Sequence, residues 1–145
     1  MRIQAALLFF GYDMTDEHYP WEVGPGFTIN RKKAAFRGHD AALAAEGKER
    51  FVAVGIVFDH DDAVAGGETL QWNGEDVGVI NSPGYSHRLG KSPALVHLRR
   101  DAAVLGTQLQ AVGEGTTYVA SVAQVPFYDP TKSRVRGRQK RMHLA

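Results

Sequence analysis

Short apolar runs alternate with glycine turns from Arg50 onward, which is the pattern of a β protein. Phe51 to Phe58 alternates Val with small residues and predicts a half-buried strand. Asn73-Gly74 is the strongest hairpin signal in the chain and joins two further strand-like runs. The six expected strands are Phe51–Phe58, Thr69–Trp72, Glu75–Asn81, Ser92–Arg99, Thr107–Val112 and Thr117–Val125. Six short strands with glycine turns predict a closed or nearly closed antiparallel barrel.

The first 49 residues follow a different pattern. Ala5–Phe10 is an unbroken apolar run, too short for periodicity to distinguish a helix from a buried strand. A polar loop rich in Pro and Gly follows, and Phe27–Asn30 is expected to form a short strand. His39 to about Gly47 predicts a helix, because its alanines, Leu43 and Glu46 favour helix and Gly47 favours a stop. The expected fold is therefore mainly β: a six-stranded antiparallel barrel preceded by a short α/β segment with one helix.

The length of 145 residues fits one domain with linked segments. We divide it into residues 1–49, a barrel domain over residues 50–131 and a tail over residues 132–145. Cysteine is absent, which excludes disulfides and thiolate chemistry and suits a cytoplasmic protein. No apolar run approaches the ~20 residues of a membrane span, so no membrane partner is expected.

Charge is distributed unevenly along the chain. The tail carries six cations and no acid: Lys132, Arg134, Arg136, Arg138, Lys140 and Arg141. The first 131 residues contain 11 basic and 16 acidic side chains, so an acidic body carries a basic tail. Such a tail binds a polyanionic ligand or an acidic partner, or it is a solvated terminus. Nucleic acid is not an expected partner, because the tail has no aromatic residue on which bases could stack.

Motifs for metal, phosphate and nucleophilic chemistry are missing. The run from Asp59 to Asp62, D-H-D-D, lacks the spacing of a calcium loop and is interpreted as an exposed turn. Gly90-Lys91-Ser92 spells G-K-S, but Tyr85 stands where a phosphate loop needs its first glycine. No serine lies in a G-x-S-x-G context. We therefore expect no metal site and no catalytic residue in this chain.

Several segments nevertheless share their order and spacing with a known family. From Val77 the chain reads V-G-V-I-N-S-P-G-Y-S-H-R-L, and from Gln124 it reads Q-V-P-F-Y-D-P. Both resemble the C-terminal barrel domain of the glycine-cleavage aminomethyltransferase (T-protein) family. The start, M-R-I-Q-A-A-L-L-F-F-G-Y-D, is similar to the family's L-R-L-E-A-G-L-x-x-Y-G-x-D. Pro20-x-Glu22 and Phe36-x-Gly38 match its P-x-E and F-x-G.

The resemblance implies a tetrahydrofolate cofactor. It places Arg2 at the position of a family arginine that contacts folate, and a guanidinium provides forked donors for a carboxylate or a pterin oxygen. Lys132 or Arg134 holds the place of a further cofactor contact just after the P-F turn. The chain departs from the family at Gln4, where the family has Glu, and at Ala6, where it has Gly.

The resemblance covers about the C-terminal third of a family member, without the region that carries the catalytic aspartate. Asp13 and Asp16 are not equivalent to that aspartate. We therefore expect a C-terminal fragment or subunit of a folate-dependent aminomethyl or methyl transferase that is inactive alone. Its partner would be a companion chain supplying the missing N-terminal half, or a second copy of itself. The alternative is a non-catalytic β-barrel that serves as a binding or assembly module.

Overall fold

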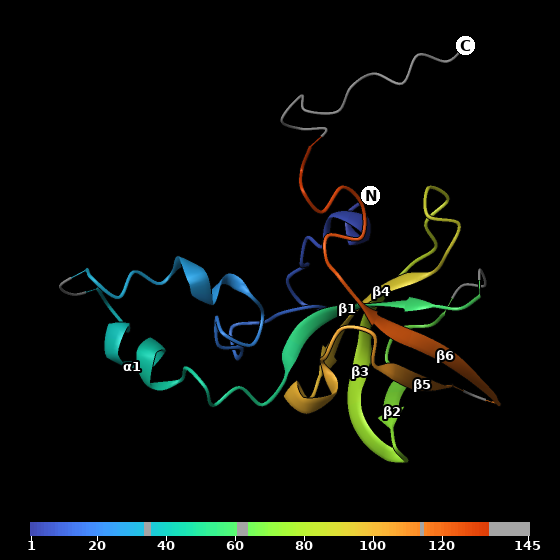
Figure 1. Cartoon of the computed structure of the whole chain (residues 1–145). Helices are drawn as coiled ribbons and strands as arrows, with labels where there is room; N and C mark the ends of the chain where they lie inside the picture. The colour runs from blue at the N-terminus through green and yellow to red at the C-terminus, as the bar shows by residue number, and fades with distance from the viewer. Residues whose placement is uncertain (34–35, 61–63, 114, 134–145) are drawn as a thin grey trace, which may run out of the picture.

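Six antiparallel strands close into a barrel in the computed structural model, which describes residues 1–33, 36–60, 64–113 and 115–133 (Figure 1). Around the barrel the strand order is β1-β4-β3-β2-β5-β6. The strands are β1 (Val52–Phe58), β2 (Thr69–Trp72), β3 (Glu75–Pro83), β4 (Pro93–Leu98), β5 (Gln108–Gly113) and β6 (Thr116–Ala123). The predicted fold class and all six expected strands are confirmed, with ends that differ by a few residues.

Alternation along the strands builds the core. Side chains on a strand point to opposite faces, so every second residue faces the barrel interior. The fully buried large apolar side chains are Phe58, Ile56, Leu70, Ile80, Leu98, Leu109 and Val96. Strand β4 is the exception, because all six of its residues are buried. Its outer face is covered by the N-terminal 3₁₀ helix η1 (Ile3–Ala5), which packs against it.

Two glycines allow close approach on the barrel wall. A Cβ on Gly78 of β3 would lie 2.2 Å from the carbonyl oxygen of His97 on the neighbouring strand. A Cβ on Gly55 of β1 would lie 2.5 Å from the ring of Phe127. Gly78 thus brings β3 close to β4, and Gly55 makes room for the segment that follows β6.

The first third of the chain precedes the barrel strands. A second 3₁₀ helix, η2 (Pro25–Thr28), and the helix α1 (His39–Ala44) extend to one side of the barrel (Figure 1). We call residues 25–48 the arm. The Nε1–H of Trp21 donates to the carbonyl of Ala42 at 2.7 Å and ties the arm to the loop that precedes it. A fourth short element, η3 (Arg100–Ala102), follows β4. The predicted helix is confirmed, although it ends three residues before Gly47.

The predicted strand Phe27–Asn30 is wrong. Phe27 and Thr28 belong to η2, which starts with Pro25 after Gly24 at φ 98°. The Thr28 hydroxyl donates to the Pro25 carbonyl at 2.7 Å and holds the turn closed. The Ala5–Phe10 run, left open between helix and strand, forms neither, because Ala6 is left-handed at φ 53° and ends η1.

Several sequence features fall outside the described residues, including Asp61, Asp62 and the tail from Arg134 onward. Asp59 is exposed. Among the described residues, no helix is long and apolar enough to cross a membrane. Nor does any group of three His, Asp or Glu side chains in the described ranges form a candidate metal site.

Candidate functional site

The N-terminal segment, residues 1–22, crosses the outside of β3 and β4 and builds a polar site there. Arg2 and Asp13 come from this segment, Asn81 and Ser82 from β3, and His97 from β4. Asp13, Ser82 and His97 are buried, so most of their polar atoms are expected to find hydrogen-bond partners inside the protein.

Arg2 is held by three hydrogen bonds. Its Nη1 donates to Asp13 Oδ2 at 2.6 Å and to the Leu7 carbonyl at 2.8 Å, and its Nη2 donates to Ser82 Oγ at 2.8 Å. The guanidinium also lies 5.5 Å from the centre of the Phe9 ring. One third of the Arg2 side chain stays exposed. Residue 2 is thus fixed in place, with part of its side chain facing solvent.

Asp13 is the centre of this network. Its Oδ2 accepts from Arg2 and from the Phe9 backbone N–H at 2.8 Å. Its backbone carbonyl accepts from His97 Nε2 at 2.7 Å, which fixes the proton on that nitrogen. Asp13 Oδ1 and Asn81 Oδ1 are buried without a hydrogen-bond partner among the described residues. The Asp13 carboxylate therefore positions Arg2 through its Oδ2.

An aromatic stack supports His97. Its ring lies on Phe51 with centroids 4.1 Å apart, and His18 meets it edge-on at 5.2 Å. Burial lowers the pKa of His97, and this outweighs the hydrogen bond to the Asp13 carbonyl, which favours the charged form. His97 is therefore a neutral side chain that links the N-terminal segment to the barrel.

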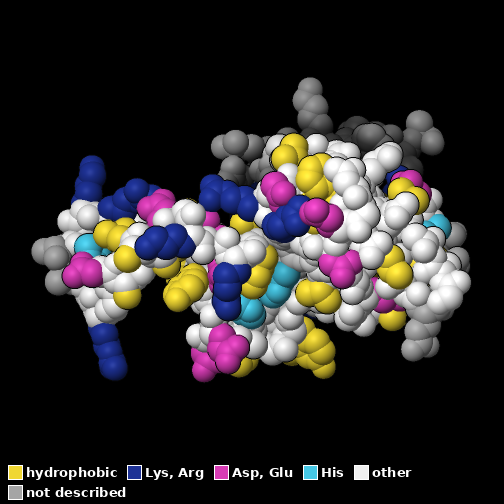
Figure 2. Space-filling view, turned by 90° about the horizontal axis from the view of Figure 1, so that it is seen from below, with side chains coloured by type: hydrophobic (Ala, Val, Ile, Leu, Met, Phe, Trp, Pro, Cys, Tyr) yellow, Lys and Arg dark blue, Asp and Glu magenta, His cyan; other side chains and the backbone are white. Residues whose placement is uncertain are grey.

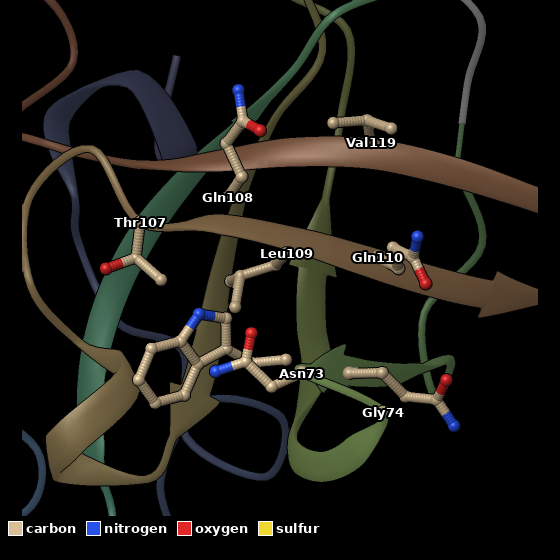
Figure 3. A pocket seen from close by; sticks show the side chains of 9 residues that line it. Asn73, Gly74, Thr107, Gln108, Leu109, Gln110 and Val119 are labelled. Carbon is tan, nitrogen blue, oxygen red and sulfur yellow. The ribbon is translucent and has the colours of Figure 1, made fainter.

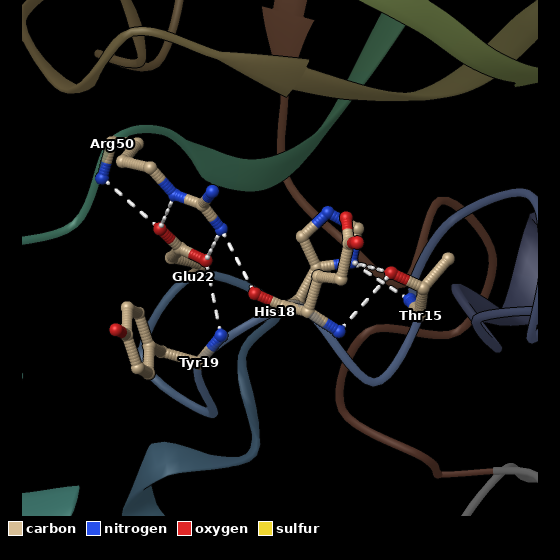
Figure 4. A network of polar contacts seen from close by, with 6 residues as sticks. Thr15, His18, Tyr19, Glu22 and Arg50 are labelled. Atoms are coloured by element: carbon tan, nitrogen blue, oxygen red, sulfur yellow. Dashed lines mark hydrogen bonds and ion pairs between the residues drawn. The ribbon is translucent and has the colours of Figure 1, made fainter. Parts of the chain in front are cut away.

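A second ion pair attaches the same segment at its other end (Figure 4). Glu22 is completely buried, and Arg50 forks onto it through Nε at 2.8 Å and Nη2 at 2.9 Å. The backbone N–H groups of Tyr19 and Arg50 also donate to this carboxylate. These bonds, the Arg50 side chain first, lower the pKa of Glu22 to about 2. The P-x-E motif thus fixes the loop against the start of β1.

Lys132 lies beside the segment that Arg2 holds. It lines an apolar groove of about 400 Å³ together with Ala6, Leu7, Leu95 and Val125. Both Ala6 and Lys132 have positive φ, at 53° and 54°, which is costly for residues with a Cβ. Two of the three predicted cofactor residues therefore lie in or beside the N-terminal segment: Arg2 belongs to it, and Lys132 lies next to it. Arg134 lies outside the described residues.

Sequence reasoning missed the supporting residues Asp13, Asn81 and His97. Their contacts join positions up to 84 residues apart, so no local pattern indicates them. The only signal was the shared order of motifs, since Asp13 closes the G-x-D match and Ser82 lies in the S-P turn.

Comparison with known proteins decides the family. The profile of the glycine cleavage T-protein C-terminal barrel domain matches residues 50–129. The chain belongs to this family. The T-protein match covers the barrel and the residues that follow β6, up to residue 129. The predicted resemblance is confirmed.

Full-length relatives also match the region before the barrel. The chain is 34% identical to the heme-dependent oxidative N-demethylase gamma subunit of Ectopseudomonas mendocina, over 92% of this chain and 38% of the relative. It is 34% identical to an aminomethyltransferase of Shouchella clausii, over 91% of this chain and 36% of the relative. The chain thus spans little more than a third of the length of these T-protein relatives.

The crystal structure of aminomethyltransferase T from Bartonella henselae has the same architecture. It superposes with a TM-score of 0.82 at 25% identity, covering 89% of this chain and 37% of that structure. The match therefore includes residues before the barrel as well as the T-protein barrel itself.

Proposed function

We propose that this chain forms one wall of a tetrahydrofolate site in a one-carbon transferase and works together with a companion polypeptide. Its T-protein relatives include an aminomethyltransferase and the subunit of an N-demethylase. Both names describe chemistry on a carbon attached to nitrogen. We propose the same chemical class for the complex, and no transfer by this chain alone.

The arrangement of Arg2 carries the proposal. A guanidinium has five N–H donors, and three hydrogen bonds use part of them. The remaining donors belong to a side chain that is one third exposed and already held in one orientation. A preorganised arginine loses little entropy when it binds a carboxylate or a pterin oxygen. This geometry fits folate, which carries both groups.

The exposed side chains of the N-terminal segment support a companion. Leu7, Phe9 and Phe10 are 61%, 50% and 64% exposed. Neighbouring exposed apolar side chains of this kind mark an interaction surface. About 60% of the length of each relative lies outside the matched part. A companion chain that carries this part would cover these side chains. Pairing with a second copy of this chain is the competing arrangement.

Calorimetric titration with 5-formyltetrahydrofolate, a stable folate, tests the site. We expect weak binding by the chain alone. Arg2→Lys keeps the charge but loses the fork, so binding should weaken by at least ~10-fold, the effect of about 1.4 kcal/mol. Arg99→Lys is the matched control, because Arg99 makes only surface ion pairs, with Glu75 and Asp101.

Circular dichroism must show that both variants fold. Equal affinities of wild type and Arg2→Lys would reject the assignment of Arg2. A chain that binds no folate, alone or with its companion, would instead favour the non-catalytic binding or assembly module.

A further inference from the structure

A seam opens in the barrel wall where β2 ends. The ladder between β2 and β5 has three rungs, and the last one pairs Gln71 with Gln110. Beyond it, β2 turns into the hairpin at Asn73-Gly74, while β5 continues back toward Thr107. A cavity of about 520 Å³ lies between the hairpin and β5. Figure 3 shows Asn73 and Gly74 on one side of this seam and Thr107, Gln108 and Leu109 on the other.

The hairpin itself keeps the seam open. Asn73 and Gly74 have φ values of 53° and 82°. Two successive positive φ values are those of a type I′ turn, which a two-residue hairpin requires. Asn73 is the residue that the register would place opposite Gln108, and in this turn it cannot continue the strand. The chain therefore cannot close its own ladder at this point.

The main chain of Gln108 faces the seam. In an antiparallel ladder, successive residues direct their N–H and C=O groups to opposite neighbours. The Thr107 carbonyl accepts from Val122 N at 3.0 Å, so Thr107 directs its carbonyl toward β6. Gln108 must then direct its N–H and C=O toward β2. The ladder between β2 and β5 ends at Gln110, so no residue of β2 pairs with Gln108. One residue thus offers a donor and an acceptor at the spacing of a strand rung.

The lining of the seam is polar but uncharged. No side chain that lines it carries a charge; it consists of amides, Thr107 and apolar groups. The side-chain amides of Asn73, Gln108 and Gln110 make no hydrogen bond to any described residue, while Gln71 donates to Asp76 at 2.8 Å. Free amides provide both donors and acceptors. The ligand that matches them is neutral and has donors and acceptors of its own.

We propose that this seam binds an extended, uncharged polypeptide segment that adds one strand rung at Gln108. The main chain of the segment would exchange two hydrogen bonds with Gln108, and its amides would meet Asn73 and Gln110. Unpaired strand groups are the usual template for strand addition. The site lies on the β2 and β5 side of the barrel, whereas Arg2 contacts β3, so it does not depend on the proposed folate function.

A carbohydrate fits the seam less well. Sugar rings are recognised on the open face of an aromatic side chain. Trp72, the aromatic residue among those lining the seam, is half-buried and packs against the barrel core. The indole therefore supports the wall instead of offering a free face.

Nuclear magnetic resonance of the ¹⁵N-labelled chain tests the proposal with the uncharged peptide acetyl-Thr-Gln-Val-Asn-Thr-amide. We expect saturable shifts at Gln108, Gln110 and Asn73, and slower solvent exchange of the Gln108 amide proton. The same peptide with its central Val N-methylated lacks one rung donor, and it should bind at least about tenfold more weakly. This comparison needs no variant of the protein.

Two variants separate main chain from side chain. Gln108→Pro removes the N–H that faces the seam without breaking a ladder bond, so it should abolish the shifts while the fold persists. Gln108→Ala keeps the main chain and should retain binding within a few-fold. Equal binding of the N-methylated peptide, shifts away from the seam, or shifts produced by cellotetraose but not by the peptide would each overturn the proposal.

Discussion

Two buried carboxylates, each paired with a partly exposed arginine, attach the N-terminal segment to the barrel. Asp13 pairs with Arg2, and Glu22 pairs with Arg50. Removing one partner of such a pair leaves a buried charge or a buried unpaired donor, which is strongly destabilising. The position of the arginine that we assign to folate therefore depends on a carboxylate that need not touch the ligand.

Glu22 should make the stability of the fold depend on pH, with a definite sign. Its folded pKa of about 2 lies below the ordinary value of 4.5, so the pair stabilises the protein above pH 4.5. This contribution disappears as pH falls from 4.5 toward 2. Because half of the Arg50 side chain is in water, we expect the pair to contribute about 2 kcal/mol to the free energy of unfolding. Urea unfolding of wild type and Glu22→Gln should differ by this amount at pH 7 and converge near pH 2. If the two unfolding free energies differed by the same amount at every pH from 7 to 2, the lowered pKa of Glu22 would be contradicted.

Ala6 is a strained position at which the family has glycine. Its φ of 53° costs an L-residue about 1 kcal/mol, and glycine removes most of that strain. Ala6→Gly should therefore raise the free energy of unfolding by up to about 1 kcal/mol. Ala5→Gly is the control, because Ala5 is helical and glycine there should destabilise. Thermal melting of both variants distinguishes the two signs, and a destabilised Ala6→Gly would disprove the strain.

At the scale of elements, alternation made the barrel predictable. Most strands carry a period-two pattern, with the fully buried β4 as the exception, and the Asn73-Gly74 turn fixes one hairpin. The region before the barrel carries no such pattern. Its 3₁₀ turns depend on local details, such as Pro25 after Gly24, that outweigh the β-like run Phe27–Asn30. Arg2 could be found through the family motif and Asp13 closes the G-x-D of that motif, but His97 carried no such signal, because its contact with Asp13 is long-range.

Strand packing makes Gly78 the most sensitive glycine of the barrel. An added Cβ would collide with backbone, the His97 carbonyl at 2.2 Å, so β3 and β4 would have to separate. Gly78→Ala should cost roughly 2–4 kcal/mol. At Gly66 the nearest atoms lie at 3.5 Å, an ordinary contact, so Gly66→Ala should change stability little. Similar melting temperatures for the two variants would refute the close approach.

The whole molecule combines a closed barrel with an arm that few contacts support. Figure 2 shows the arm as a narrow lobe from which Lys and Arg side chains project, beside the larger barrel. The described arm carries Arg31, Lys32, Lys33, Arg37 and Lys48. Together with the tail, whose sequence is basic, the chain has two segments of net positive charge, whereas the rest of the sequence is acidic. A polyanion would be attracted to these two segments in preference to the barrel.

This separation of charge predicts how folate binding depends on salt. Folate ends in a glutamate with two carboxylates, which the acidic body repels and the tail attracts. The tail beyond Ser133 carries five cations and no acid. Exposed charge pairs contribute about 1 kcal/mol or less each and are screened by salt. Affinity should therefore fall clearly as ionic strength rises.

A chain ending at Ser133 separates the tail from Arg2. It should bind 5-formyltetrahydrofolate more weakly at low salt and lose most of the salt dependence. The same truncation in an Arg2→Lys background should weaken binding further, because a forked contact and long-range attraction act independently. Calorimetry at two salt concentrations measures all four chains. If truncation leaves the salt dependence unchanged, the attraction belongs to the arm or the groove, and the tail is a solvated terminus.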